Sequence, residues 1–285
     1  MNESVVASQP TVPRRNSSGL RRDLELLQTL GSAEATAAGG LGVLRIAELV
    51  GRDKGTVSRS LATLAEAGLV SRDTTTNAYR LGFQLYALAA RTVEARLMRL
   101  ALPYLRRVVA ATHETTHLCV LRGGNVLTLA SELSEYQFRG LGWQGVSTAA
   151  WQTSSGRVLI SDWADEDLKL WYDEHGHDSA VTRTGSFARL ETEVLVQPPG
   201  GTPKVTDFAS LKAEIRDIQK HGYASVDEEF EAGVVGVSAP VLDFRRNIIA
   251  AINISAPKSR LGTRLDEAGQ LAAKVATELS AQLGA

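Results

Sequence analysis

Segment 43–81 constrains the fold of this chain most, because two short helical patterns follow each other across a tight turn. The first covers 43–50, is mainly apolar and stops at Gly51. The second begins after Asp53, whose carboxylate suits a helix N-cap, and stops at Gly68, which suits a left-handed C-cap. Its apolar residues recur on one helix face: Val57, Leu61, Leu64 and Ala65. Two helices joined by such a turn predict a helix-turn-helix.

The second helix of this motif carries residues suited to DNA. In a helix-turn-helix, its N-terminal residues face base edges in the major groove. Segments 69–72 and 78–81 resemble two short strands around a polar turn, which predicts a wing beside the sugar-phosphate backbone. The predicted DNA-contacting residues are Arg21, Arg22, Arg45, Lys54, Gly55, Thr56, Ser58, Arg59, Arg72, Thr75 and Asn77. The alternative is an ordinary helical hairpin within a core, but helix, turn, helix and wing in this order favour DNA binding.

Charge is divided unevenly along the chain. Residues 1–100 hold 13 Lys and Arg against 9 Asp and Glu, a net charge of +4, whereas residues 101–285 hold 18 against 23, a net charge of −5. A positive amino-terminal part suits a phosphate-binding module attached to a second domain. A chain of 285 residues can form two domains, each with its own core.

Cysteine content and hydropathy bound the setting of the protein. The single cysteine, Cys119, excludes an internal disulfide framework and fits a reducing cytoplasm. No apolar run reaches the roughly 20 residues of a membrane span, so we expect no membrane partner. Segment 1–18 is polar and lacks the apolar core of a signal peptide, which predicts a disordered tail.

Apolar spacing predicts the remaining elements. Helices are expected at 20–35, 82–98, 100–111 with a break before Pro103, 155–163, 165–175, 206–221 and 264–283. Strands are expected at 117–121, 126–130, 223–226, 234–242 and 248–255, whereas 140–153 looks irregular and 178–205 shows no clear pattern. Helices beside antiparallel-type strands predict an α+β fold. The expected domains are a winged helix-turn-helix at 19–81, a linker helix at 82–100 and an α/β domain at 101–285.

Two segments of the second domain resemble a known family. Residues 221–255 read HGYASVDEEFEAGVVGVSAPVLDFRRNIIAAINIS, and residues 153–157 read TSSGR at the start of a predicted helix. Together with a winged helix at the amino end, these segments resemble the IclR family of bacterial transcription regulators. The resemblance covers the chain from Leu20 to its end.

The resemblance implies an operator-binding winged helix, a linker helix and a GAF/PAS-like effector-binding domain. It also implies homodimers formed through the DNA-binding parts and often homotetramers formed through the sensor domains. The effectors of the family are usually small organic acids or aromatic catabolites. Carried over by position, the effector-binding residues are Leu129, Leu133, Trp143, Trp151, Thr153, Ser154, Ser155, Gly156, Asp227, Gly236, Asn253 and Ser255. The chain departs from the family pattern at 149–151, at Arg157 in place of the usual Lys, and at Asn253 where Ser is frequent.

Residue chemistry points to the same region with alternatives left open. Thr153 to Gly156 opens a helix and could cradle a carboxylate, or Thr153 could simply be an N-cap. Trp143 and Trp151 could stack on an aromatic ligand or cover the sheet. Asn253 and Ser255 alternate with isoleucines, so both should face one side of a strand, where a ligand or neighbouring backbone could satisfy them.

Three patterns could suggest an enzyme, and each has a simpler interpretation. Residues 113–117 match the HExxH zinc pattern, which needs a helix, yet two threonines stand at its centre and a strand begins at His117. Cys119 lies within an apolar strand and is expected to be buried. The acidic run 227–229 is expected to be a solvated turn, with Asp227 facing the pocket as the alternative. We therefore expect no catalytic residues, no metal and no cofactor.

The sequence thus predicts a regulator that binds double-stranded operator DNA and responds to a small organic or aromatic acid. Repression of a catabolic operon, relieved by the effector, is the commoner behaviour in the family, and activation is the other possibility. The rival interpretations are a constitutive DNA-binding protein without a ligand and a metalloenzyme that uses His113 and His117.

Overall fold

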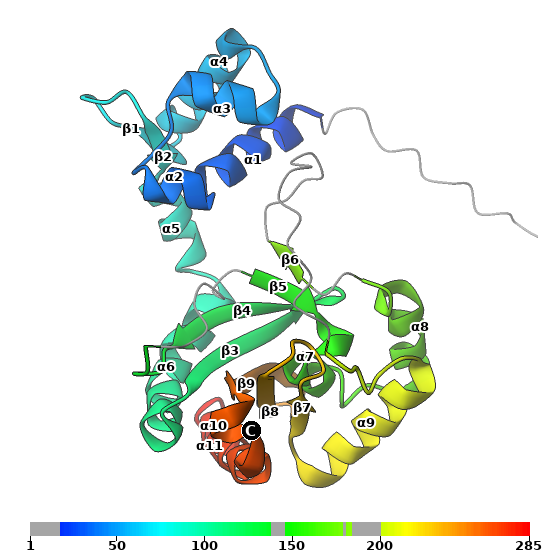
Figure 1. Cartoon of the computed structure of the whole chain (residues 1–285). Coiled ribbons are helices and arrows are strands. Elements are labelled where there is room, and N and C mark those ends of the chain that lie inside the picture. The colour runs from blue at the N-terminus through cyan, green and yellow to red at the C-terminus, as the bar shows by residue number, and fades with distance from the viewer. Residues whose placement is uncertain (1–17, 138–145, 179–180, 184–200) are drawn as a thin grey trace, which may run out of the picture. The chain divides into compact units, whose positions relative to one another are not determined.

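The computed structural model describes residues 18–137, 146–178, 181–183 and 201–285 (Figure 1). These residues form two compact units, one that ends at Ala89 and one that begins at Ala90. The disordered tail predicted for 1–18 concerns residues 1–17, which lie outside the described residues. Among the described helices, none has the length and apolar character needed to cross a bilayer.

The first unit is a helical domain with a two-stranded wing. Its elements are α1 (Ser18–Leu30), α2 (Ala33–Ala37), α3 (Val43–Val50), α4 (Lys54–Glu66), β1 (Val70–Arg72), β2 (Tyr79–Leu81) and α5 (Phe83–Ala89). The core is built from one face of each helix and from the wing, and Leu26, Ile46, Val57 and Leu61 are fully buried in it. The predicted helix-turn-helix and wing are confirmed.

Two helix boundaries differ from the sequence prediction. The helix expected at 20–35 is interrupted after Leu30, because the Ser32 side chain accepts a hydrogen bond from the Ala35 N–H and so begins a new helix, α2. The linker helix expected at 82–98 is also interrupted: α5 ends at Ala89, and α6 (Val93–Thr112) begins where Thr92 caps the Ala95 N–H. The break expected before Pro103 does not occur. Pro103 is exposed within α6, so water can satisfy the carbonyl that its ring leaves unbonded.

The second unit is built on one seven-stranded sheet in the order β6-β5-β4-β3-β9-β8-β7, and every neighbouring pair is antiparallel. The strands are β3 (Thr115–Arg122), β4 (Asn125–Glu132), β5 (Val146–Ala149), β6 (Val181–Arg183), β7 (Ala224–Asp227), β8 (Val234–Leu242) and β9 (Ile248–Pro257). The five predicted strands are confirmed as β3, β4, β7, β8 and β9. The short strands β5 and β6 fall where the sequence showed no strand pattern.

Helices cover both faces of this sheet (Figure 1). One face packs on α6, α10 (Lys258–Leu261) and α11 (Leu265–Gln282), and the other on α7 (Ser154–Leu159), α8 (Asp165–His175) and α9 (Phe208–His221). Short 3₁₀ turns cover Ala150–Gln152 and Gly262–Arg264. The helix expected at 155–163 is shorter, because α7 ends at Leu159. The predicted α+β class is confirmed.

Alternation along the central strand β9 separates a core side from a polar side. Ile252 and Ile254 are fully buried in the layer against α6 and α11. Asn253 and Ser255 point to the opposite face, as the sequence predicted. The register places His117 of β3 opposite Asn253 and Thr115 opposite Ser255, so polar groups of two neighbouring strands gather on one face.

Candidate nucleic-acid interface and effector pocket

The N-terminus of α4 is held by its cap. Asp53 Oδ1 accepts from the Thr56 N–H at 3.0 Å, and the preceding helix ends at Gly51 with a φ of 62°. Hydrogen bonds from the Thr56 hydroxyl and N–H lower the pKa of Asp53, so its carboxylate is charged at neutral pH. Asp53 therefore fixes where the recognition helix begins, as the sequence predicted.

The predicted reading residues of α4 face outward. Lys54, Gly55 and Arg59 are exposed, and Thr56 and Ser58 are half-buried at the edge of the packed face. The Arg59 Nη2 donates to Thr56 Oγ1 at 3.4 Å, which lays the guanidinium along the helix surface. A helix with one buried and one polar, cationic face can enter a major groove without disturbing the core.

The wing brings two of the predicted DNA-contacting residues together. Arg72 Nη2 donates to Asn77 Oδ1 at 2.8 Å, and the Arg72 guanidinium lies 5.6 Å from the ring centre of Tyr79. Asp73 Oδ1 accepts from the N–H groups of Thr75 and Thr76, which closes the turn. The exposed Thr75 therefore lies in a turn that is ordered by its own hydrogen bonds.

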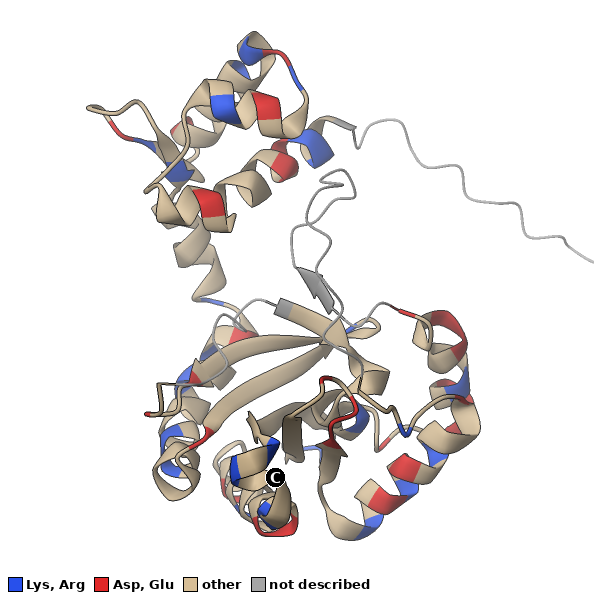
Figure 2. Cartoon of the chain, in the orientation of Figure 1, with Lys and Arg blue, Asp and Glu red and all other residues tan. Residues whose placement is uncertain are grey.

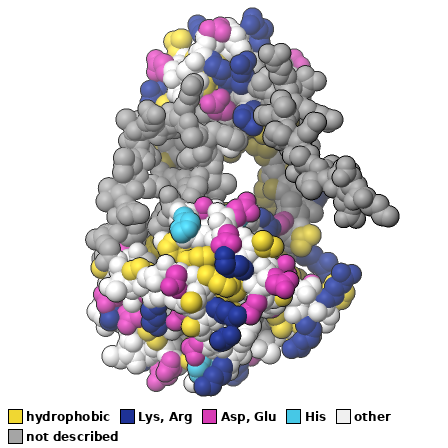
Figure 3. Space-filling view, turned by 90° about the vertical axis from the view of Figure 1, so that its right-hand side faces the viewer, with side chains coloured by type: hydrophobic (Ala, Val, Ile, Leu, Met, Phe, Trp, Pro, Cys, Tyr) yellow, Lys and Arg dark blue, Asp and Glu magenta, His cyan; other side chains and the backbone are white. Residues whose placement is uncertain are grey.

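The three remaining arginines of the prediction are exposed but differ in their partners. Arg45 pairs with Glu34 at 2.7 Å and with Glu48 at 3.3 Å, so part of its charge is already neutralised. Arg21 and Arg22 lie exposed on α1. Both charge signs occur on the first unit, with Lys and Arg on α1, α3 and α4 (Figure 2). On the face of the second unit shown in Figure 3, cationic and anionic side chains are interspersed, which offers no basic stripe there.

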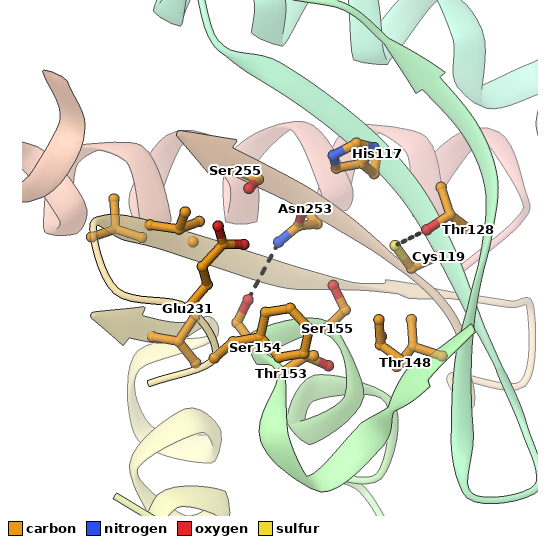
Figure 4. Close-up of a pocket in the computed structure, with 16 residues that line it drawn as sticks. His117, Cys119, Thr128, Thr148, Thr153, Ser154, Ser155, Glu231, Asn253 and Ser255 are labelled. Carbon is orange, nitrogen blue, oxygen red and sulfur yellow. Dashed lines mark hydrogen bonds between the residues drawn. The ribbon is translucent and has the colours of Figure 1, made fainter. Parts of the chain in front are cut away.

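A cavity opens on the sheet face opposite α6 and α11. The empty space within it and at its open mouth amounts to about 670 Å³, which includes space open to solvent. Strands β3, β4, β5, β7, β8 and β9, the start of α7 and the turn between β7 and β8 supply its walls (Figure 4). Six of the predicted effector residues line it: Thr153, Ser154, Ser155, Gly236, Asn253 and Ser255.

Buried hydroxyls beneath this cavity satisfy one another. Ser238 Oγ lies 2.9 Å from Ser154 Oγ and 3.1 Å from Ser155 Oγ. Asn253 Nδ2 donates to Ser238 Oγ at 3.0 Å, to the Val237 carbonyl at 3.2 Å and to Ser154 Oγ at 3.3 Å. Neighbouring groups therefore satisfy the Asn253 amide as a donor, which was one of the two partners considered from sequence.

A helix cap uses one N–H group of the carboxylate cradle proposed at 153–156. Thr153 Oγ1 accepts from the Gly156 N–H at 3.1 Å, so Thr153 acts as the N-cap of α7. Gly156 itself supports packing, because a Cβ there would lie 2.0 Å from the Ala150 carbonyl oxygen. The N-cap interpretation of this segment is confirmed, and the carboxylate cradle stays a prediction.

Five predicted effector residues lie away from the cavity. Leu129 packs on the opposite face with the cluster that includes α6 and α11, and Leu133 is exposed. Trp151 packs in the layer with α7, α8 and α9, and Gly156 packs against the backbone of Ala150. Asp227 is exposed and pairs with Lys258 at 3.0 Å, so it does not face the cavity. Trp143 lies outside the described residues.

Sequence reasoning missed several lining residues. They are His117, Cys119, Val126, Thr128, Thr148, Val226, Phe230, Glu231, Val234 and Val235. Burial lowers the pKa of His117 to about 4 and raises that of Cys119 to about 11, so both side chains are uncharged at neutral pH. Period-two alternation in β3, where His117 and Cys119 oppose Leu118 and Val120, is the signal that could have found the first two.

The HExxH match has no helical context. His113 is the C-cap of α6 with a φ of 60°, and His117 lies in β3 with its Nδ1 2.8 Å from Ser131 Oγ. The two imidazoles therefore do not occupy one helix face, which the zinc motif requires. Within the described ranges, no group of three His, Cys, Asp or Glu side chains is arranged to hold a metal ion.

A buried ion pair anchors the turn beside the cavity. Arg157 Nη2 donates to Glu229 Oε2 at 2.6 Å, and each side chain is only 1% exposed. Arg157 Nε also donates to the Trp151 carbonyl at 3.0 Å, and Nη1 lies 3.4 Å from Glu214 Oε2. The solvated turn predicted for 227–229 is thus wrong for Glu229, because a buried arginine distant in sequence draws that carboxylate inward.

Comparison with known proteins identifies both units. The family model described as the IclR helix-turn-helix domain matches residues 19–74, and the model described as the bacterial transcriptional regulator IclR C-terminal matches 89–197 and 188–281.

Individual relatives are more distant. The chain is 28% identical over 187 residues to the HTH-type transcriptional regulator BhcR of Paracoccus denitrificans, which covers 65% of this chain and 59% of that protein. It is 25% identical over 162 residues to the Pca regulon regulatory protein of Pseudomonas putida, 56% of this chain and 49% of that one. The match therefore spans between about half and three fifths of the length of these relatives.

A solved structure shares the fold. It is an IclR homolog complexed with 4-hydroxybenzoate from Microbacterium hydrocarbonoxydans, with a TM-score of 0.74 and 22% identity, covering 93% of this chain and 99% of that chain.

Proposed function

The chain belongs to the IclR family of bacterial transcriptional regulators, and we propose that it is a ligand-responsive repressor of a catabolic operon. The observation that carries the proposal is the outward-facing surface of α4, where Lys54 and Arg59 stand clear of an intact core. The proposed division is DNA binding by 19–81, linkage by 82–100 and effector binding by 101–285. A small molecule in the cavity would favour one arrangement of two winged helices over another.

Arg59 is the residue best placed to test base reading. An exposed arginine on the first turns of a recognition helix can donate two hydrogen bonds to one guanine edge, and such a contact contributes about 1–3 kcal/mol of discrimination. Operator sequences can be selected from random duplexes with the full-length protein and then used in fluorescence anisotropy. Arg59→Ala should weaken binding to the selected operator about 5- to 150-fold and binding to random DNA much less.

Arg216→Ala is the matched control, because Arg216 is an exposed arginine on α9 of the second unit. It should leave both affinities unchanged. Equal losses for operator and random DNA with Arg59→Ala would contradict base reading and assign the arginine to phosphate contact. If the full-length protein selects no DNA sequence, the proposed function as an operator-binding regulator is contradicted.

The cavity supports the proposal of a small-molecule effector. Its described walls combine apolar side chains with hydroxyl, amide and carboxylate groups, as ligand pockets commonly do. Ser255→Ala is the sharpest test, because the Ser255 side chain lies in the cavity whereas Asn253 also holds Ser238 and Ser154. Ser255→Ala should shift the effector dose response of operator release while leaving operator affinity without effector unchanged. An unaltered dose response would remove Ser255 from the site.

We also propose that the protein acts as a homodimer that can assemble into a homotetramer. Large apolar side chains are exposed at the end of the first unit: Phe83 is 77%, Tyr86 is 78% and Leu88 is 53% exposed. No residue of α5 is buried within the chain. A second copy is the partner that fits this surface, because two winged helices are needed to meet two half-sites at a fixed spacing.

A further inference from the structure

The outer face of α8 presents a leucine surrounded by carboxylates. Leu170 is 70% exposed, whereas the inner face of the helix is buried in the core. The residues three and four positions before and after Leu170 share its helix face. All four are exposed and acidic: Glu166, Asp167, Asp173 and Glu174. A large apolar side chain that stays in water within a charged rim is typical of a protein-protein contact.

Part of this acidic rim has no cation of its own. Lys169 pairs with Asp173, and Glu174 Oε1 lies 4.0 Å from His175 Nε2. Among the residues that the structure describes, Glu166 and Asp167 make no ion pair and no side-chain hydrogen bond. The rim therefore carries net negative charge, and a partner that covers Leu170 should bring cations.

The hairpin between β8 and β9 carries the complementary set of side chains. Its turn exposes Phe244, which is 66% accessible, together with the exposed Arg245 and Arg246. The Arg245 guanidinium lies 5.1 Å from the ring centre of Phe244. In the described part of the chain, neither guanidinium pairs with a carboxylate. The turn thus offers one aromatic ring and two free cations.

Hydrogen bonds hold this turn in one conformation. Asp243 Oδ1 accepts from the N–H of Arg245 at 2.8 Å and from the N–H of Asn247 at 3.0 Å. The Asp243 N–H also donates to the Asn247 carbonyl at 3.0 Å, which closes the hairpin. An ordered turn can bind a partner without the entropy cost of ordering a flexible loop.

The hairpin and α8 adjoin each other in the second unit. Asp162, in the turn between α7 and α8, accepts from the N–H of Ile248, the first residue of β9, at 3.0 Å. Ile248 also packs against the layer that contains α7, α8 and α9. The side of the unit that carries α8 and α9 exposes apolar side chains among acidic and basic ones (Figure 3). Because the two surfaces adjoin, two copies related by a two-fold axis can exchange their hairpins.

From these observations, and resting on the proposed assembly into homotetramers, we propose that the β8–β9 hairpin of one copy docks on α8 of a second copy, and the reverse. Phe244 covers Leu170 of the partner subunit, and the two arginines of the turn bind the acidic rim around it through charge-assisted hydrogen bonds. A second copy is the partner that fits, because the chain itself carries both complementary surfaces. The two-fold arrangement satisfies both surfaces of both copies and closes the assembly.

This contact is separate from the exposed surface of α5, so it joins two dimers into a tetramer. Ion pairs between exposed side chains are weak and are screened by salt. We therefore expect tetramers to form only at protein concentrations above those at which α5 dimers form, and to dissociate as the salt concentration rises.

The test is charge reversal, followed by sedimentation velocity of the full-length protein over a range of concentrations. The hairpin variant is Arg245→Glu with Arg246→Glu, and the helix variant is Glu166→Lys with Asp167→Lys. Each variant places like charges opposite each other at both contacts, so each should form tetramers about tenfold or more weakly than wild type.

A mixture of the two variants supplies the decisive measurement. When a dimer of the hairpin variant meets a dimer of the helix variant, an acidic hairpin faces a basic helix at one contact, and a wild-type hairpin faces a wild-type helix at the other. The equimolar mixture should therefore form tetramers about as well as wild type, whereas each variant alone does not.

Arg216→Glu with Lys274→Glu is the matched control, because it reverses two exposed cations on α9 and α11 and changes the net charge as the hairpin variant does. It should leave tetramer formation within about twofold of wild type. Thermal melting verifies that every variant is folded. The proposal is overturned if either reversed variant assembles as wild type does, or if the mixture assembles no better than the variants alone. It is also overturned if the hairpin variant loses affinity for DNA of any sequence while its assembly is unchanged, because the arginines would then bind phosphate.

The same samples separate this contact from the function on which it rests. Tetramers that form in wild type and in every variant would refute the contact and leave the homotetramer standing, whereas wild type that never exceeds a dimer would contradict both. A hairpin variant that remains dimeric should still bind a selected operator, because its α4 is unchanged. Wild type that selects no operator would count against the regulator, whatever its assembly.

Discussion

Replacement of Arg157 by methionine should be among the most destabilising single changes in the second unit. Methionine matches the length of the arginine stem but leaves Glu229, which is 1% exposed, as a buried carboxylate without its cation. Removing one partner of a buried ion pair typically costs about 3–5 kcal/mol, because the remaining charge stays desolvated. The Trp151 carbonyl also loses the donor that Arg157 Nε supplies. For a domain of this size, the loss corresponds to a fall in Tm of about 6–20 °C.

Tryptophan fluorescence is a selective assay for this unit. All four tryptophans of the chain, Trp143, Trp151, Trp163 and Trp171, follow Ala90 in the sequence. Thermal and urea unfolding of the full-length protein, followed by this signal, therefore report on the unit that contains Arg157. Arg106→Met is the matched control, because it breaks the Arg106–Glu132 pair of 3.0 Å, in which Arg106 is 68% exposed. Exposed pairs contribute at most about 1 kcal/mol.

A second substitution distinguishes lost charge pairing from lost packing. In the double variant Arg157→Met with Glu229→Gln, the buried charge is gone, so the variant should regain about 1–3 kcal/mol relative to Arg157→Met alone. The reasoning is refuted if Arg157→Met costs no more than the exposed control. It is equally refuted if the double variant is less stable than the single one, because then the buried arginine stabilises the unit by packing and not by pairing with Glu229.

Three further predictions concern other features. The double variant Phe83→Ser with Tyr86→Ser removes exposed apolar area from α5. It should convert dimers to monomers in sedimentation equilibrium without lowering the stability of the first unit. Dimers that persist would place the interface elsewhere. Burial lowers the pKa of His117 from 6.5 to about 4, so the unfolded state binds the proton at a higher pH than the folded state does. The free energy of unfolding should therefore fall by up to about 3 kcal/mol as the pH drops from 6.5 toward 4. Urea unfolding of His117→Leu should show a flatter pH dependence over that range than wild type. Burial raises the pKa of the Cys119 thiol to about 11, so it should react with a disulfide reagent slowly in the native protein and rapidly in denaturant; equal rates would show that the cavity is open to the reagent.

The first unit was predictable from sequence because its signals are local. Asp53 caps α4 by accepting from the N–H three residues ahead, Gly51 and Gly68 have positive φ at helix ends, and apolar spacing fixes which face of α4 is buried. The boundaries that failed depended on single caps: Ser32 and Thr92 begin new helices where composition favoured continuous ones. A hydroxyl that accepts from one backbone N–H can therefore outweigh the helix propensity of the residues around it.

The second unit was predictable as a set of elements and less so as a site. Period-two alternation placed Asn253 and Ser255 on the polar face of their strand. It could not place Leu129, because the register between β3 and β4 shifts at Leu118 and Cys119, and the side chain packs against α6 and α11. The sequence presented His117 as part of a possible zinc motif. In the structure His117 lies opposite Asn253 on the neighbouring strand, and this pairing places it in the cavity wall. Strand pairing, which depends on distant residues, decides such positions.

The acidic run at 227–231 shows why ligand class lies beyond local pattern. Asp227, Glu228, Glu229 and Glu231 have the same chemistry and nearly the same sequence neighbours. Their surroundings differ because the cations come from elsewhere: Lys258 at the start of α10 pairs with the first two, and Arg157 of α7 pairs with the third. Phe230 and Glu231 directly follow the anchored Glu229, and both line the cavity. The carboxylate that this segment presents to the cavity is thus the one that the fold has not paired with a cation from elsewhere.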